Sequence, residues 1–374
     1  MKALEFYSGI GGLHLALSRS NAPASVSHAF DWDQNACDVY SANFGPGIAG
    51  KVDIMTLTVA YLASLKASLW LLSPACQPYT VLNSSAKGEL DPRAKSFIHL
   101  VQDVIPELAR EDAHPTHFLV ENVGGFETST TRQILVSTLR SLGYTIAEFL
   151  LTPLQFGIPN SRLRYYLLAK RSPLSFRDLP SDEGGTLRYI PGRGDAWIDS
   201  RLVEDNSVLE IREYLDPEPV SGYDIPDKIL RKWGRLFDIV LPSFRRTCCF
   251  TRGYTQLVER AGSILQMNED QDVSPLYLLS TATVFDVFLQ EQSSAPAGNT
   301  LDSVRTLDSL RLRYFTPEEL LRLFCFAPVP CSSPSEPPFI WPENISRKTK
   351  YRLIGNSVNV RVVQELIEYL FEEP

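Results

Sequence analysis

The chain has 374 residues, of which 44% are hydrophobic, so it is long enough for two or three domains and can bury a large core. Its formal net charge of -8 argues against indiscriminate binding to nucleic acid, although a locally basic face could still bind it. The six cysteines lack a C-x-x-C spacing, which argues against a structural zinc site and a disulfide framework. No apolar run reaches the roughly 18 residues that span a bilayer, which argues against a transmembrane helix.

Up to about residue 170, short runs typical of strands alternate with longer amphipathic runs typical of helices. The expected strands are 4–8, 26–31, 68–73 and 117–122, and the expected helices are 11–20, 34–44, 96–108 and 131–142. This alternation predicts an α/β fold with a Rossmann-like, mostly parallel sheet and helices on both faces.

The alternation stops at about residue 171, which predicts a division of the chain into three parts. A catalytic and cofactor-binding region over 1–171 is expected to precede a smaller region over 172–345, which is rich in Pro, Gly, Asp and Arg at its start. The segment 346–374 ends in an amphipathic helix, RVVQELIEYLFEE, which we expect to dock on the first region.

The stretch FYSGIGG follows an expected strand and opens an expected helix. Its glycines let the backbone approach a ligand at the helix N-terminus, although a plain strand-to-helix connection would have the same composition. Asp31 ends the next strand about 20 residues on, where a carboxylate can bind ribose hydroxyls, and Trp32 could stack on adenine unless it packs in the core. The G-x-G-G spacing favours a nucleoside cofactor such as S-adenosylmethionine over NAD. The expected cofactor residues are Phe6, Tyr7, Ser8, Gly9, Ile10, Gly11, Gly12, Asp31, Trp32, Asp53 and Ile54.

The stretch SPACQPYT places Cys76 directly after a short apolar run. A buried structural thiol is the commonest fate of cysteine, but Pro74 and Pro78 exclude regular helix and central strand here. Cys76 therefore lies in a loop at the C-terminal end of a buried strand, the edge at which open α/β sheets bind ligands. The next strand end adds a carboxylate, and a later extended segment adds two guanidiniums. The expected catalytic residues are Cys76, Glu121, Arg162 and Arg164.

These stretches, in this order, resemble the motifs of the cytosine-5 methyltransferases over nearly the whole chain. FYSGIGG resembles the first cofactor motif, SPACQPYT the cysteine-nucleophile motif, ENVGGFE the Glu-Asn-Val motif, SRLR the Arg-x-Arg motif and YRLIGNSVNV the C-terminal motif that returns to the cofactor. CFTRGY, LRYFTPEEL and GIPNSRLRYYLLAK look most like the members that methylate aspartate tRNA. The resemblance implies a class I S-adenosylmethionine-dependent methyltransferase with a smaller target-recognition domain, and no metal.

The resemblance also implies further binding residues and partners. The added cofactor residues are Ser73, Pro74, Asn356, Ser357 and Val358. The implied substrate residues are Arg93 in the loop 81–95, Asn122, Val123, Cys249, Phe250, Thr251, Arg252 and Tyr254, with Arg245 and Arg246 as basic neighbours, although the CFT residues could instead pack in the core. We expect a monomer in the cytoplasm or nucleus that acts on tRNA or, alternatively, on DNA, leaves S-adenosylhomocysteine as product, and does not bind membranes.

The chemistry of cytosine explains why these residue types occur together. C5 is a poor nucleophile until a thiolate adds to C6, which Cys76 would do as a covalent catalyst. Glu121 would stabilise the ring and bind its edge, while Arg162 and Arg164 would hold the base oxygen and the nearby phosphate and favour the thiolate. Ala75 stands where the family usually has a second proline, which loosens the loop and should slow catalysis at most. Tyr79 replaces the usual Phe and adds a hydroxyl.

Three other functions compete with this interpretation. A thiol hydrolase would need a histidine beside the cysteine, and among the five histidines only His117 precedes a strand near the proposed edge. A zinc nucleobase deaminase is disfavoured because neither H-x-E nor P-C-x-x-C occurs. A binding protein that has lost catalysis is disfavoured because the thiol, the acid and both guanidiniums are present. The histidines are His14, His28, His99, His114 and His117.

Overall fold

The computed structural model describes residues 1–79, 91–180, 185–193, 207–218, 220–256, 261–270, 306–330 and 337–374. Most of the expected substrate loop, 81–90, and most of the Ser/Pro-rich stretch near 332–338 lie outside these residues. Within the described part, no helix is long and apolar enough to cross a membrane.

The larger part of the protein is built on a seven-stranded sheet with the order β3-β2-β1-β4-β5-β7-β6. Its strands are β1 (Lys2–Phe6), β2 (Ser25–Asp31), β3 (Ala49–Lys51), β4 (Leu69–Leu72), β5 (His117–Val123), β6 (Tyr144–Leu151) and β7 (Arg164–Arg171). All neighbours are parallel except β7, which runs antiparallel to β5 and β6. The predicted fold class is confirmed.

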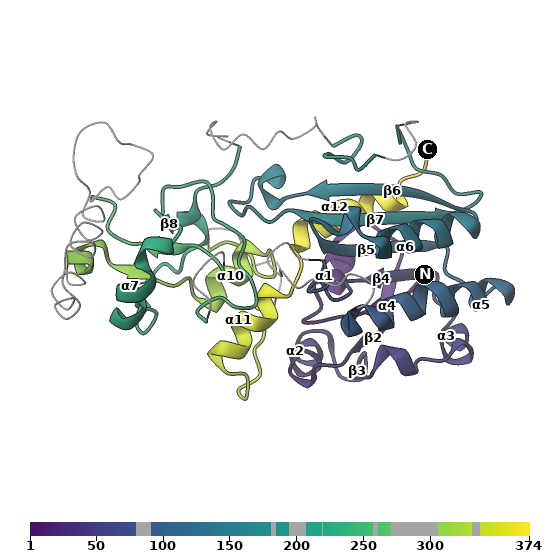
Figure 1. The fold of residues 1–374 in the computed structure, drawn as a ribbon, viewed down its shortest axis with the longest axis horizontal. Helices are drawn as coiled ribbons and strands as arrows, with labels where there is room; N and C mark the ends of the chain where they lie inside the picture. Colours follow the sequence, from purple (N-terminus) through teal and green to yellow (C-terminus); the bar gives the residue numbers. More distant parts are fainter. Residues whose placement is uncertain are drawn as a thin grey trace.

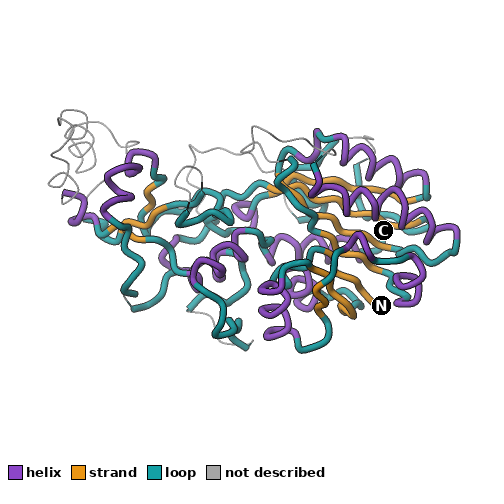
Figure 2. The backbone as a smooth tube through the Cα atoms, turned by 60° about the horizontal axis from the view of Figure 1, so that its bottom comes forward, coloured by secondary structure: helices purple, strands orange, loops and turns teal. Residues whose placement is uncertain are grey.

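Helices cover both faces of this sheet (Figure 1, Figure 2). One face carries α1 (Gly12–Arg19), α2 (Gln34–Phe44) and α12 (Val360–Phe371), and the other carries α3 (Val59–Leu65), α4 (Lys95–His99), α5 (Ile105–Arg110) and α6 (Thr130–Ser141). Strand β4 shows why both faces must be covered: Leu69 and Leu71 belong to one buried cluster, and Trp70 and Leu72 belong to the other.

The segment Lys95–Arg110 is nearly one continuous helix, as predicted, but its middle turn is wider than an α-helix. Leu100–Val104 is a π-helical turn between α4 and α5. Pro106 lies at the start of α5, and its ring cannot be placed over the preceding turn of an α-helix without a clash. The wider turn removes that clash, so the chain keeps its helical direction.

The smaller part lies at one end of the molecule (Figure 1). It contains a three-stranded sheet of β8 (Ile239–Val240), β9 (Ile264–Gln266) and β10 (Leu312–Arg313), and the helices α7 (Asp227–Trp233), α10 (Pro317–Leu323) and α11 (Arg347–Gly355). A buried ion pair between Arg313 and Glu319 joins β10 to α10 at 2.7 Å. Single 3-10 turns occur at Ile54–Thr56, Pro92–Ala94, Phe126–Thr128, Pro153–Phe156, Ile211–Tyr214, Gly234–Leu236 and Thr306–Leu310.

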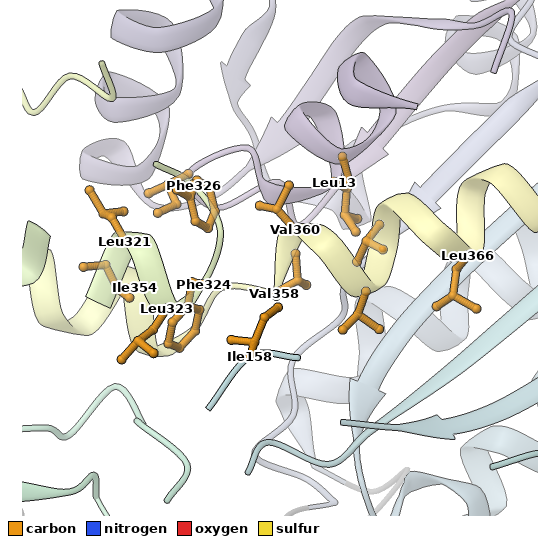
Figure 3. Close-up of a cluster of buried hydrophobic side chains, with 14 of the residues drawn as sticks. Leu13, Ile158, Leu321, Leu323, Phe324, Phe326, Ile354, Val358, Val360 and Leu366 are labelled. Carbon is orange, nitrogen blue, oxygen red and sulfur yellow. The ribbon is translucent and has the colours of Figure 1, made fainter. Parts of the chain in front are cut away.

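The helix α12 returns the chain to the large sheet and packs against α1, as the sequence predicts. Its apolar face joins the buried cluster that contains Leu13, Ile158 and Phe324 (Figure 3). Val358, Val360 and Leu366 bring residues from the end of the chain into the same cluster as the first helix. The glycine loop FYSGIGG, which leads into α1, is therefore supported by the packing of the last helix on α1.

Candidate active site

The carboxyl ends of β1, β4 and β5 lie at one edge of the sheet. Phe6 pairs with Leu72, and Leu72 pairs with Val120, so the residues that follow these three strands emerge side by side. The glycine loop follows β1, the cysteine loop follows β4, and Glu121 lies next after Val120 on β5. Parallel pairing thus brings together groups that are far apart in sequence.

The cysteine loop is anchored at both ends by hydrogen bonds. The Ser73 hydroxyl donates to the carbonyl of Tyr7 at 3.0 Å, and the Asn122 amide donates to the carbonyl of Pro74 at 3.3 Å. The backbone N–H of Tyr79 donates to the carbonyl of Cys76 at 3.0 Å. Asn122, which the resemblance implied as a substrate residue, therefore also holds the cysteine loop, and it supports the segment in which Ala replaces a proline.

The extra hydroxyl of Tyr79 also has a partner. It donates to Oγ1 of Thr131 at 2.9 Å, while the ring packs edge-on against Phe126. The departure from the family's usual Phe is therefore accommodated by a polar residue on α6, which keeps the C-terminal side of the loop in the core.

Cys76 is half-buried and Glu121 is buried, and the charge of Arg164 acts on both groups. Burial, together with the charge of Glu121, raises the pKa of Cys76 overall, and the charges of Arg164 and Arg162 offset only part of the rise. Burial also raises the pKa of Glu121, against the same two guanidiniums, so its carboxyl holds a proton more readily than an exposed glutamate. Nε of Arg164 lies 3.4 Å from Oε1 of Glu121. This arrangement suits an acid that stabilises developing charge beside a thiolate.

Arg162 is hydrogen-bonded to the backbone of two other segments. Its guanidinium is buried and donates to three backbone carbonyls, those of Phe250 at 2.8 Å, Gly355 at 3.1 Å and Ser357 at 2.6 Å. These contacts give Arg162 a structural role, but its Nε has no hydrogen-bond partner among the described residues, so contact of Arg162 with the base or a phosphate stays a prediction. Arg164 remains the guanidinium that faces Glu121.

Cys249, which the resemblance implied as a substrate residue, contacts both arginines of the Arg-x-Arg segment, and the sequence did not predict this contact. Its sulfur accepts from Arg162 at 3.5 Å and from Arg164 at 3.6 Å. Burial raises the pKa of Cys249, but the two guanidiniums outweigh it and lower the pKa overall. The only sequence signal was the CFT stretch, which gives no indication of contact with the Arg-x-Arg segment.

Two of the expected substrate residues lie in the core. The rings of Phe250 and Tyr254 are buried and pack at 90° with centroids 5.0 Å apart, and Tyr254 also donates to the carbonyl of Ser263. Their expected contact with substrate is corrected to support of the backbone around them. Thr251 is half-buried and Arg252 is exposed, so these two residues can still meet a substrate.

The glycine loop leaves open space at one glycine and allows a close approach at another. Gly9 and Gly11 have φ angles of 53° and 85°, which favour glycine. A Cβ at Gly11 would lie 2.2 Å from Phe44, whereas no atom lies within 4 Å of a Cβ built at Gly9. The hydroxyl of Ser8 is buried without a hydrogen-bond partner in the described structure. An open cradle with an unpaired polar atom fits the amino-acid end of S-adenosylmethionine.

The expected cofactor residues at the strand ends differ in their contacts and exposure. Asp31 accepts from the backbone N–H of Gly9 at 2.8 Å and of Asp33 at 2.9 Å, which fixes its carboxylate against the loop. Trp32 beside it is 75% exposed, as a residue that stacks on adenine should be. Asp53 is exposed and caps the turn at Ile54. The side chains of the remaining expected cofactor residues Phe6, Ile10 and Ile54 are buried, so only their backbones can face a ligand.

The turn Asn356–Val358 returns to the glycine loop, where the resemblance implied that it should. A Cβ added at Gly12 would lie 2.6 Å from Cγ2 of Val358 and 3.1 Å from Oγ of Ser357. Helix α11 is also tied to the cofactor edge by an ion pair between Arg352 and Asp33.

Arg93 and Val123, two further residues that the resemblance implied as substrate contacts, are both partly accessible. Both side-chain nitrogens Nε and Nη2 of Arg93 donate to Asp91, at 2.9 and 2.6 Å, and 46% of the Arg93 side chain remains exposed. Val123 ends β5 next to Asn122 and is half-buried.

The competing hydrolase interpretation fails on geometry. His117 begins β5 and pairs with Leu69 at the start of β4, which is the opposite edge of the sheet from the cysteine loop. Its ring is buried and stacks on Phe371. Across the ranges that the structure describes, no group of three or more His, Cys, Asp or Glu side chains could hold a metal ion.

The chain is similar in sequence and fold to known cytosine-C5 methyltransferases. Residues 1–372 match the family described as C-5 cytosine-specific DNA methylase. The tRNA (cytosine(38)-C(5))-methyltransferase of Schizosaccharomyces pombe is 37% identical over 374 residues, 100% of this chain and 97% of that protein. A DNA (cytosine-5)-methyltransferase of Dictyostelium discoideum is 33% identical over 99% of this chain and 94% of its own. The crystal structure of the S. pombe Dnmt2 methyltransferase has a TM-score of 0.74 at 34% identity, covering 99% of this chain and 98% of its own.

The match to the family covers the glycine loop, the cysteine loop, the Glu-Asn-Val strand end and the returning turn, and it confirms the resemblance in the sequence. The chain belongs to the cytosine-C5 methylase family.

Proposed function

We propose that this protein methylates C5 of a cytosine in the anticodon loop of tRNA, aspartate tRNA above all, through a covalent bond between Cys76 and the base. The observation that carries the proposal is the meeting of a partly exposed Cys76 with Glu121 and Arg164 at the carboxyl edge of the sheet. This set supplies a nucleophile, an acid and a positive charge for one base.

The residues of the chain perform the reaction in a fixed order. The thiolate of Cys76 adds to C6, and the electron pair that moves into the ring is stabilised by Glu121, whose raised pKa lets it hold a proton near ring N3. C5 thereby becomes nucleophilic. S-adenosylmethionine, when bound, supplies the methyl group that C5 receives. A water molecule takes the C5 proton, the C5–H electron pair re-forms the C5–C6 double bond, and the C6–S bond breaks to release Cys76 as the thiolate.

Arg164 acts on both the nucleophile and the acid. Its charge lowers the pKa of Cys76 against the effect of burial and so increases the thiolate fraction. The same guanidinium lies close enough to Glu121 to orient it. On the cofactor side, Ser8, Gly9, Asp31 and Trp32 would hold S-adenosylmethionine.

RNA is favoured over DNA as substrate by the name and the full-length similarity of the S. pombe relative. An anticodon loop offers unstacked bases, whereas a duplex base must be flipped out before Cys76 can reach C6. The D. discoideum relative is named as a DNA methyltransferase, which makes DNA the second candidate.

The proposal is tested by bisulfite sequencing of total tRNA after incubation with the purified protein and S-adenosylmethionine, with duplex DNA in a parallel reaction. We expect a new protected cytosine in the anticodon loop of aspartate tRNA with the natural chain and none with Cys76→Ala. Loss of the nucleophile should lower the rate by several orders of magnitude while cofactor affinity stays nearly unchanged.

The matched control is Cys248→Ala, since the thiol of Cys248 lies beside Asp238 and Ser263 rather than at the edge, and its activity should be retained. RNA with 5-azacytidine at the target should become covalently attached to Cys76, because nitrogen at ring position 5 blocks the final elimination. Methylation by Cys76→Ala, or an adduct on another cysteine, would contradict the assignment of the nucleophile.

A further inference from the structure

Three segments that are distant in sequence meet at the guanidinium of Arg162. The first is the segment before β7 that carries Arg162, the second contains Phe250 of the CFT stretch, and the third is the turn between α11 and α12. Nη1 donates to the carbonyl of Phe250 at 2.8 Å, and Nη2 donates to the carbonyls of Gly355 at 3.1 Å and Ser357 at 2.6 Å. One planar group therefore holds two backbone segments to a third.

The two segments that Arg162 joins also touch each other directly. A Cβ added at Gly355 would lie 2.2 Å from the carbonyl carbon of Thr251 and 2.3 Å from the nitrogen of Arg252. Only glycine permits this backbone-to-backbone approach. The end of α11 and the CFT stretch are thus packed as one unit, independently of the hydrogen bonds.

The same turn reaches the cofactor loop. Val358 and Ser357 lie against Gly12, where a Cβ would approach them to 2.6 and 3.1 Å. A continuous path therefore runs from the glycine loop through Ser357 to Arg162, and from there to the exposed Arg252. A ligand that rigidifies one end of this path can lower the entropy cost of binding at the other end, without any change in the average structure.

The chemistry of arginine matters at this position. A guanidinium has five N–H donors in a fixed plane, so it can bond to carbonyls of two segments at once, which a lysine ammonium of shorter reach does poorly. Arg162 also lies over the ring of Phe324 at 4.9 Å, which holds its plane in place. A lysine would keep the positive charge and lose the bridge.

We propose that Arg162 is a positioning residue that couples the cofactor site to the substrate-facing segment Thr251–Arg252, so that each ligand binds more tightly when the other is present. The inference rests on the proposed function, since it takes tRNA and S-adenosylhomocysteine as the two ligands. Because coupling of binding is reciprocal, it can be measured from either side.

The test is calorimetric titration of S-adenosylhomocysteine into the full chain with and without a saturating unmodified aspartate tRNA transcript. We expect the Kd to fall about fivefold or more when tRNA is present, the lower end of typical coupling between sites. In Arg162→Lys the ratio of the two Kd values should fall towards one. A ratio unchanged in Arg162→Lys would overturn the role of Arg162.

Arg322→Lys is the matched control. Arg322 also joins segments, through the carbonyl of Tyr214 at 3.1 Å and Asp216 at 2.8 Å, but it does not bond to the turn between α11 and α12. If the Lys substitution only loosens a contact between segments, Arg322→Lys should leave the ratio of the two Kd values as it is in the natural chain. A loss of coupling in both variants would indicate a structural effect and overturn the proposal.

Hydrogen exchange of the natural chain decides the matter even where Arg162→Lys fails to fold. S-adenosylhomocysteine alone should slow exchange at the amides of Thr251 and Tyr254, which donate to Ala261 and Thr251. Unchanged exchange there, with the ligand bound, overturns the coupling.

Failure of the coupling and failure of the proposed function give different results. If tRNA is methylated but the Kd ratio of the natural chain is one, the coupling is wrong and the function stands. If the ligand binds but no tRNA is methylated, the function is wrong, and exchange still tests the Arg162 bridge.

Discussion

Glu5 lies within β1 without exposed surface, and its Oε2 accepts a hydrogen bond of 2.8 Å from the Tyr40 hydroxyl. Burial raises its pKa from 4.5 to about 8, although the Tyr40 hydrogen bond opposes the shift. The folded chain therefore holds a proton that the unfolded chain has already lost at neutral pH. Stability from this group is fully present below the unfolded pKa and is lost as pH rises towards 8.

Glu5→Gln should remove that loss. In the natural chain this group alone lowers the free energy of unfolding by about 1.4 kcal/mol per pH unit between the two pKa values. The variant keeps the shape without the titration, so urea unfolding between about pH 5 and 8 should show a flatter pH dependence. Equal slopes for the two proteins would mean that Glu5 is ionised in the fold.

At the same scale, the sequence predicted which side chains meet at the edge of the sheet more readily than it predicted their hydrogen-bond partners. Cys76 and Glu121 could be placed at one edge because parallel strands deliver their following residues together. The position of Arg162 could not, since its three carbonyl partners come from two distant segments whose approach depends on Gly355. Phe250 was similarly ambiguous, because an aromatic residue in a loop is equally suited to a core and to a base.

At the scale of elements, periodicity located β1, β2, β4 and β5 and the helical segments 12–19, 34–44, 95–110 and 130–141, because each has a continuous apolar face. It missed β3 and α3, since β3 is a three-residue strand without an apolar face and α3 is a short helix with only one buried side chain. The boundaries shifted where backbone geometry intervened: β1 stops at Phe6 because Tyr7 has a φ of 59°, a conformation that strands do not adopt. The antiparallel placement of β7 between β5 and β6 had no local signal, because pairing direction depends on the connection and not on composition.

The helix α12 gives a prediction at this scale. Leu366 is fully buried in the cluster shared with α1, so Leu366→Ala should lower the free energy of unfolding by about 2–5 kcal/mol through lost contacts and a cavity. Arg361→Ala on the exposed side of the same helix, with 49% of its side chain accessible, should change it by about 0.5 kcal/mol or less. Denaturant unfolding measures both, and equal effects would contradict the packing of α12.

At the scale of the whole molecule, a chain with a formal net charge of -8 must bind an anionic substrate through a restricted surface. The basic residues around the CFT stretch differ in their partners. Arg245 pairs with Glu210 at 3.0 Å and Arg246 pairs with Asp238 at 2.9 Å, whereas Arg252 is exposed beside Thr251. The sequence suggested all three as a basic patch, and the structure leaves Arg252 as the strongest candidate for a phosphate contact.

Arg252→Ala should therefore weaken tRNA binding and lower the slope of log Kd against log salt by about one, as the loss of one phosphate contact does. Arg246→Ala, with its neighbour Asp238 left in place, should change the slope much less. Filter binding over a range of salt concentrations distinguishes the two. A smaller effect at Arg252 than at Arg246 would place the RNA elsewhere.

The packing of α12 on α1 also has a consequence for synthesis of the protein. A ribosome releases the residues of α1 first, and their apolar face meets its partner only after Leu366 and its neighbours have emerged. The emerging chain must therefore carry a half-covered sheet through most of translation, a state that invites aggregation or a chaperone. A message truncated before α12 should yield a product that is degraded, even though every residue of the glycine loop and the cysteine loop is present.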